Sequence, residues 1–353
     1  MTRQILVGGV AIGGGAPVTI QSMNNTKTHD VAATVDQISQ LAAAGCEITR
    51  VAVPDEQAAR AIEEIVAASP IPVVADIHFD YKLALLCAEA GIHKIRINPG
   101  NIGGRERVQA VAVACGKRGI PIRIGVNGGS LHPELLRKYG GVTAEALAES
   151  ALSQAAMLAE FDFRDICISI KSSHVKTMMA AYRIVSNACD YPLHLGVTEA
   201  GTLHMGTVKS AIGIGGLLAD GIGDTFRVTL TADPVEEVRI AKDILQAVGL
   251  RREGVEIISC PTCGRTNIDL FSLVELVEQQ VKTIKTPLTV AIMGCAVNGP
   301  GEARHADFGI AGGMDEGLIF AKGEILRKVP QAQLVEELMR EIKGDIGTGA
   351  SEE

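Results

Sequence analysis

The sequence predicts an α/β protein, a (β/α)8 TIM barrel followed by a small α+β domain. Short runs rich in β-branched residues alternate with Ala-rich amphipathic stretches, which is typical of parallel βαβ units. Eight such units occupy about 250 residues, the number and size of a closed barrel. After residue 249 the strands follow one another and the helices are separate, which indicates an α+β domain.

The eight expected barrel strands share apolar, β-branched compositions. They are residues 18–23, 47–53, 72–78, 94–98, 121–127, 165–170, 192–198 and 225–230. Helices are expected at 30–44, 55–68, 105–118, 143–159 and 233–248. Residue types that cap helix N-termini stand at Asp30, Asp55, Thr143 and Asp233. Glycines suited to a left-handed C-terminal cap stand at Gly45, Gly91, Gly119 and Gly249.

An open, doubly wound sheet is the rival fold. It needs fewer strands and usually has a phosphate-binding glycine fingerprint after the first strand. The glycine string here, residues 13–15, precedes the first strand instead. We therefore favour the barrel, and we interpret residues 8–17 as a hairpin that closes its floor.

The expected domain boundary divides a barrel at 1–249 from an α+β domain at 250–353. In the second domain we expect helices at 268–282 and 331–343 and a disordered tail at 347–353. The expected strands of this domain are residues 255–259, 288–293, 307–312 and 317–322.

Composition excludes several classes of protein. The 353 residues hold 33 Lys and Arg against 41 Asp and Glu, a net charge of −8, which argues against binding to nucleic acid or to a membrane surface. Aromatic content is 3% with no Trp, so base-stacking platforms are not expected. The eight cysteines are too few for a disulfide scaffold, and no signal peptide or membrane span is recognisable. We expect a soluble cytoplasmic protein.

Polar residues gather at the ends of the predicted barrel strands, where barrel enzymes hold their active sites. These residues are Gln21, Arg50, Asp76, His78, Arg96, Asn98, Arg123, Asn127, Lys171, Ser172, His194, Glu199, Arg227 and Thr229. Four guanidiniums and an amine at one mouth indicate a pocket for a multiply anionic ligand. The alternative is that each Arg pairs with an exposed carboxylate. Glu199 is either an acid–base group or a partner that orients an Arg.

Three cysteines of the second domain have the spacing of a metal or cluster site. Cys260 and Cys263 form a Cys-x-x-Cys pair, and Cys295 follows 32 positions later. Three thiolates suit zinc or an iron–sulfur cluster, and a redox-active dithiol is a weaker third reading. The only nearby imidazole, His305, has unusual spacing for zinc. A [4Fe–4S] cluster accepts three Cys, with Glu302 as a candidate fourth ligand, so we favour the cluster.

Six motifs carry a resemblance to a known family. They are GAPVTIQSMNNT at 15–26, IRINPGN at 95–101, RIGVNGGSL at 123–131, HLGVTEAG at 194–201, SCPTCGR at 259–265 and MGCAVNGPGE at 293–302. In these motifs, and over nearly its whole length, the chain resembles the bacterial, two-domain 4-hydroxy-3-methylbut-2-enyl diphosphate synthases.

The resemblance implies reductive opening and dehydroxylation of 2-C-methyl-D-erythritol 2,4-cyclodiphosphate in isoprenoid synthesis, with flavodoxin or ferredoxin as electron donor. It implies a [4Fe–4S] cluster on Cys260, Cys263, Cys295 and Glu302, and proton transfer by Glu199. The implied diphosphate-binding residues are Arg50, Arg96, Arg123, Asn127, Lys171, Arg227 and Thr229. The strand-end pattern adds Asn98, Ser172 and His194 to this set.

Two readings from other classes stay open. One is a metal-independent barrel transferase or lyase with a structural zinc, which iron and acid-labile sulfide analysis would distinguish from a cluster enzyme. The other is a non-enzymatic electron carrier or cluster scaffold, which has no use for an Arg-lined mouth. Tight binding of a diphosphate would count against that reading.

The predicted barrel also implies a dimer. A helix over 233–248 covers about 24 Å from the mouth back to the floor. The segment 249–254 stretches over only about 20 Å, so one chain would struggle to bring its thiols to its own mouth. We expect a two-fold, head-to-tail homodimer in which each cluster domain caps the barrel of the other chain and forms a composite site.

Overall fold

The computed structural model describes residues 1–349 apart from 267, 296–300 and 302. The chain divides into two compact units, Met1–Arg251 and Arg252–Glu353, each with its own hydrophobic core. No helix in the described part of the chain combines the length and the apolar character that a membrane crossing requires.

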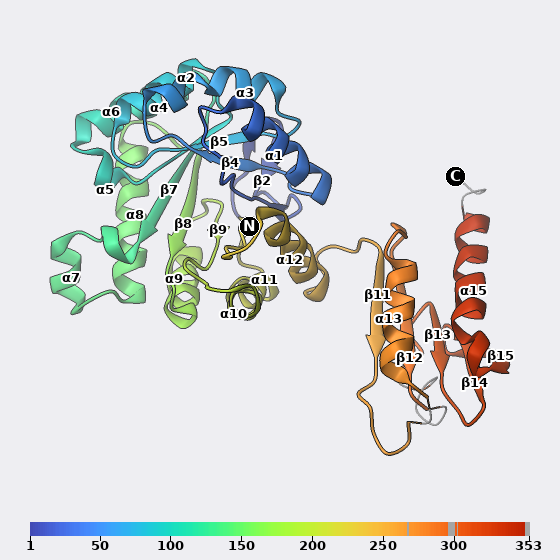
Figure 1. Ribbon diagram of the computed structural model, residues 1–353. Coiled ribbons are helices and arrows are strands. Elements are labelled where there is room, and N and C mark those ends of the chain that lie inside the picture. Colours follow the sequence, from blue (N-terminus) through green and yellow to red (C-terminus); the bar gives the residue numbers. More distant parts are fainter. Residues whose placement is uncertain (267, 296–300, 302, 350–353) are drawn as a thin grey trace. The chain divides into compact units, whose positions relative to one another are not determined.

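The first unit is a closed barrel of parallel strands, which confirms the predicted fold class (Figure 1). The strands in order are β3 (Thr19–Ile20), β4 (Thr49–Ala52), β5 (Val73–Asp76), β6 (Lys94–Ile97), β7 (Ile122–Asn127), β8 (Ile166–Lys171), β9 (His194–Leu195) and β10 (Thr225–Phe226). One sheet runs from β4 to β8, and a second has the order β3-β10-β9. The parallel bridges Gln21↔Ile48 and Ile168↔Leu193 join the two sheets and close the ring.

Helices surround these strands (Figure 1). They are α1 (Val31–Ala44), α2 (Glu56–Arg60), α3 (Ile62–Ala68), α4 (Tyr81–Glu89), α6 (Arg105–Gly116), α8 (Ala144–Glu160), α9 (Val175–Ala188), α10 (Leu203–Ser210), α11 (Gly216–Ala219) and α12 (Pro234–Ala247). The four predicted N-caps each accept a hydrogen bond from a first-turn N–H, and the four predicted C-terminal glycines have positive φ. The helix expected at 55–68 is divided at Ala61. Two short helices that the sequence did not predict, α5 (Pro99–Ile102) and α7 (Pro133–Tyr139), follow β6 and β7.

A hairpin closes the floor of the barrel, earlier in the chain than the expected 8–17. Its strands are β1 (Ile5–Val7) and β2 (Val10–Ile12), joined by a turn at Gly8 and Gly9 with φ of 55° and 90°. Tight two-residue turns of this kind need positive φ at both positions, which glycine supplies without strain. The hairpin's apolar side chains pack against buried Ile48, just before β4, Val74 of β5 and Cys167 of β8.

The second unit is a mixed sheet in the order β11-β12-β13-β14-β15. Its elements are β11 (Val255–Ser259), α13 (Leu270–Val281), β12 (Leu288–Met293), β13 (Phe308–Ala311), β14 (Glu316–Ala321), β15 (Glu324–Pro330) and α15 (Leu334–Gly349). The first three strands are parallel, and both helices share one core with the sheet. Two expectations were wrong: β15 was not predicted, and α15 runs beyond 343 into the expected tail.

Candidate functional site

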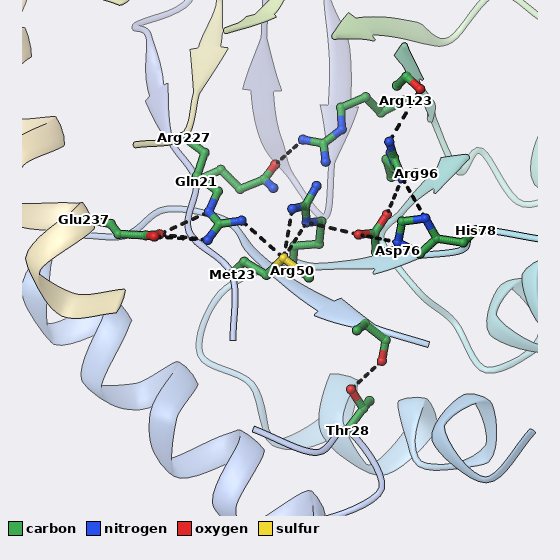
Figure 2. A network of polar contacts seen from close by, with 12 residues as sticks. Gln21, Met23, Thr28, Arg50, Asp76, His78, Arg96, Arg123, Arg227 and Glu237 are labelled. Carbon is green, nitrogen blue, oxygen red and sulfur yellow. Dashed lines mark hydrogen bonds and ion pairs between the residues drawn. The ribbon is translucent and has the colours of Figure 1, made fainter. Parts of the chain in front are cut away.

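The alternation of side chains along each strand places the cations inside the barrel. On β6, Ile95 and Ile97 belong to the core shared with the helices, so Lys94 and Arg96, which alternate with them, face the interior. On β7 the same alternation turns Arg123 inward between two buried isoleucines. Inward arginines from several strands therefore meet near the carboxyl ends, where Figure 2 shows them.

Asp76 at the end of β5 is the hub of this network (Figure 2). Its carboxylate lies 3.1 Å from Arg96 Nη1, 3.5 Å from His78 Nε2 and 3.7 Å from Arg50 Nε. Burial opposes ionisation of Asp76, but Arg50, His78 and Arg96 outweigh it and hold the pKa of this carboxyl well below its usual value. A Cβ at position 125 would overlap the Arg96 guanidinium, so Gly125 on β7 makes room for it. Asp76 thus orients two arginines.

Arg227 is held by a carboxylate that the sequence analysis did not single out. Glu237 in the first turn of α12 accepts from Arg227 Nε and Nη2, both at 3.1 Å, and from the Leu230 N–H at 3.0 Å. Glu237 is buried beside Val238 and Ile240 of the same helix. The sequence did contain a signal for Glu237, because an acidic residue on the apolar face of a helix indicates a buried partner of opposite charge.

Arg123 is fully buried and incompletely paired. Its Nη1 donates to Gln21 Oε1 at 3.3 Å, while Nε and Nη2 have no partner among the described residues. Burial, reinforced by the charge of Arg96, lowers the pKa of Arg123 to about 10. Lys94, which the sequence analysis missed, is also fully buried with an unpartnered Nζ in the described structure, and burial lowers its pKa to about 7. Arg123 lies level with its register partner Arg96, and Lys94 lies two residues deeper in the barrel, so both hold donors that lack an acceptor among the described residues.

The remaining predicted barrel residues lie near strand ends with varied roles. Asn98 Oδ1 caps α5 through the Gly100 N–H at 3.1 Å, and its Nδ2 has no partner among the described residues. Ser172 Oγ accepts from the His174 N–H, and buried His194 lies 3.4 Å from the Thr225 hydroxyl. Burial and the nearby cations hold the pKa values of His194 and Lys171 well below their usual ranges. The side chains of Asn127, Lys171 and Thr229 are partly exposed.

Glu199 follows β9 and has an unusual backbone. Its φ is 51°, in the left-handed region that non-glycine residues rarely adopt, and its side chain is exposed. A strained backbone persists only where the surrounding structure enforces it, and such residues are common in active sites. The backbone of Glu199 is therefore consistent with a functional role.

Two of the three candidate ligand thiols leave the second sheet at the same edge. Strands β11 and β12 are parallel with Ser259 opposite Ile292, so Cys260 and Cys295 both follow carboxyl ends. The Gly294 N–H donates to Cys260 Sγ at 3.1 Å. Adjacent strand ends therefore hold these two cysteines near each other.

Cys263 is the thiol best suited to bind a metal. It is exposed, and the Arg265 N–H, helped by the charge of Arg265, lowers its pKa. In contrast, burial raises the pKa values of Cys46, Cys87 and Cys115 to about 12. No three described His, Cys, Asp or Glu side chains are gathered as a metal site, and Glu302 lies outside the described residues. By donor chemistry the three cysteines fit an iron–sulfur cluster or zinc.

Fold and site together define a class: a TIM barrel with a cation-lined mouth, followed by an α+β unit in which two of the three candidate cysteines follow adjacent strand ends. Residues 2–242 match the GcpE TIM-barrel domain, and residues 256–344 match the GcpE protein C-terminal domain. The chain belongs to the GcpE family, that of the flavodoxin-type 4-hydroxy-3-methylbut-2-en-1-yl diphosphate synthases. It is 57% identical over 341 residues to the enzyme so named from Ruminiclostridium cellulolyticum, covering 97% of each chain. It is 60% identical to that from Clostridium perfringens, over 97% of this chain and 98% of the relative.

Solved structures support the barrel alone. Dihydropteroate synthase from Yersinia pestis matches with a TM-score of 0.52 and 12% identity, over 70% of this chain and 99% of that one. An N-acetylneuraminic acid synthetase from Leptospira borgpetersenii matches with a TM-score of 0.50 and 12% identity, over 80% of this chain and 99% of that one. At such identities the likeness extends to the fold and not to the chemistry.

Proposed function

We propose that this protein converts 2-C-methyl-D-erythritol 2,4-cyclodiphosphate to 4-hydroxy-3-methylbut-2-en-1-yl diphosphate, with flavodoxin or ferredoxin as electron donor. The conversion takes up two electrons and two protons and releases water. One observation supports it most: Arg50, Arg96 and Arg227 pair with two buried carboxylates, while Arg123 beside them keeps unpartnered donors among the described residues. A diphosphate supplies the missing negative charge and acceptor oxygens.

In this proposal the barrel binds the diphosphate and neutralises the charge that grows on it as it leaves carbon. Arg50 and Arg96 are held in place by Asp76, and Arg227 by Glu237, so their donors need little reorganisation. The proposed substrate-binding residues are Arg50, Arg96, Asn98, Arg123, Asn127, Lys171, Ser172, His194, Arg227 and Thr229.

The proposed cofactor is a [4Fe–4S] cluster on Cys260, Cys263, Cys295 and Glu302. When bound, such a cluster supplies single electrons and a Lewis-acidic iron. The lowered pKa of Cys263 favours the thiolate that such ligation needs. Eight free cysteines suit a reducing compartment, and we place the protein in the cytoplasm.

We assign proton transfer to Glu199, and Glu199→Gln tests this role. The amide keeps the size of the side chain but does not exchange a proton, so we expect kcat to fall about 100-fold or more with KM changed less than threefold. Steady-state kinetics with the cyclic diphosphate measures both constants. Glu134→Gln, an exposed acid in the first turn of α7, is the matched control and should retain activity. A rise in KM alone would make Glu199 a binding residue.

We further propose that the active unit is a head-to-tail homodimer with a composite site. Arg251 Nη2 donates to the Val18 carbonyl at 3.1 Å and pairs with Glu47, and both partners precede barrel strands. The first unit therefore ends at the floor, opposite the mouth. Residues 252–254 extend over only about 11 Å, which favours capping of each mouth by the second unit of the other chain.

Mixing two inactive variants, Glu199→Ala and Cys263→Ser, tests the composite site. In a mixed dimer, the intact barrel of one chain meets the intact cysteines of the other, so one of two sites works. Random exchange makes half of the dimers mixed, and we expect about a quarter of wild-type activity. Native mass spectrometry confirms that mixed dimers have formed. Mixed dimers without activity would place the whole site within one chain.

A further inference from the structure

Met23 contacts two of the mouth arginines through its sulfur. Its Sδ accepts from Arg50 Nη2 at 2.8 Å and Nε at 3.2 Å, and from Arg227 Nη1 at 3.3 Å (Figure 2). The two arginines come from β4 and from the segment after β10, the strands on either side of β3 in the ring, and Met23 follows β3 between them. Two guanidiniums aim donors at a single half-buried point.

A thioether is an unusual acceptor for two cations. It is neutral, polarisable and only weakly basic, so it gives these donors a partner without cancelling their charge. The two carboxylates near these arginines do not lie between them. Asp76 lies on the side of Arg50 away from Met23, and Glu237 binds the edge of Arg227 opposite to the nitrogen that contacts Met23. A third carboxylate at position 23 would neutralise the mouth, whereas an aliphatic side chain would leave the converging donors without an acceptor.

We propose that Met23 is a positioning residue, whose sulfur keeps Arg50 and Arg227 aimed at the point where a diphosphate oxygen binds. An incoming phosphate oxygen is a stronger acceptor and binds the same two guanidiniums beside the sulfur, which continues to hold their orientation. This inference rests on the proposed function, because it presumes that the barrel mouth binds a diphosphate. It adds a residue whose thioether would ordinarily be assigned to packing.

Leucine and glutamine at position 23 distinguish an acceptor from a packing residue. Met23→Leu keeps the volume but removes the acceptor, so we expect affinity for inorganic pyrophosphate to fall about tenfold, the effect of one lost hydrogen bond. Met23→Gln restores an acceptor of similar reach, and we expect affinity within about threefold of wild type. Calorimetry on the full-length protein measures both. With the cyclic diphosphate, Met23→Leu should raise KM by a larger factor than it lowers kcat, since the sulfur touches the arginines and not the reacting atoms.

Controls separate this proposal from the proposed function. Met157→Leu, a partly buried methionine packed on the barrel core, should bind pyrophosphate like wild type, and thermal unfolding should show all variants folded. Unchanged affinity in Met23→Leu would overturn the role of Met23, provided that Arg50→Gln still loses binding. If Met23→Gln bound pyrophosphate more weakly than Met23→Leu, Met23 would be a packing residue. A wild type that binds neither pyrophosphate nor the cyclic diphosphate would overturn both proposals.

Discussion

Cys263→Ser is expected to abolish the visible absorbance of an iron–sulfur centre and to lower reductive activity at least about 1000-fold. Cys263 is exposed, and the Arg265 N–H and charge lower its pKa, which favours the thiolate that binds iron. A serine hydroxyl is far less acidic and holds iron weakly. The measurements are a visible spectrum, iron and acid-labile sulfide counts, and turnover, all on anaerobically prepared protein.

The same variant should leave the barrel intact. The barrel has its own core, so pyrophosphate binding should stay within about twofold of wild type while colour and turnover disappear. Cys189→Ser, a partly buried thiol of the first unit, is the matched control and should keep the colour. A colourless wild-type protein that carries zinc and remains active would contradict the cluster and favour the metal-independent reading.

The alternation of eight β-branched runs with amphipathic helical stretches predicted the barrel, because their number and total length match a closed ring. Isoleucines on either side of Arg96 and Arg123 mark the outward positions, so the arginines between them had to face inward. The same rule extends to Lys94, two residues before Arg96, but a lysine at the start of a strand reads as an exposed end. Only the closed ring shows that Lys94 is buried.

Other features depend on tertiary contacts that no local pattern contains. Glu237 lies in the first turn of a helix, where acids commonly serve the helix dipole, and its bond to Arg227 becomes visible only when α12 packs against the barrel. Met23 looks like a core residue until two guanidiniums meet its sulfur. Strand β15 was missed because it is an edge strand with mostly exposed residues and interspersed charges, so its alternation is weak.

Arg123→Met is expected to affect stability and binding in opposite directions. The fully buried guanidinium has two nitrogens without partners in the described structure, and burial lowers its pKa, so the folded protein carries the cost of an incompletely compensated charge. An apolar side chain of similar length removes that cost, and we expect the free energy of unfolding to rise by about 1–4 kcal/mol. Pyrophosphate affinity should fall at least about 100-fold, because charge-assisted donors at the mouth are lost. Denaturant unfolding and calorimetry measure the two effects.

Arg123→Lys separates charge from donor geometry. An ammonium restores one positive charge but not the planar, paired donors of a guanidinium, so binding should remain about tenfold or more below wild type. Arg183→Met, which removes an arginine paired with Asp220 on the surface, is the control and should change stability by less than about 0.5 kcal/mol. If Arg123→Met instead lowered the free energy of unfolding of the ligand-free protein, the guanidinium would be a residue that stabilises the fold and not one held ready for a ligand. A rise in the free energy of unfolding together with a loss of pyrophosphate affinity is what we expect of an anion site. The unpaired guanidinium donors destabilise the ligand-free protein, and they gain acceptors only when the anion binds.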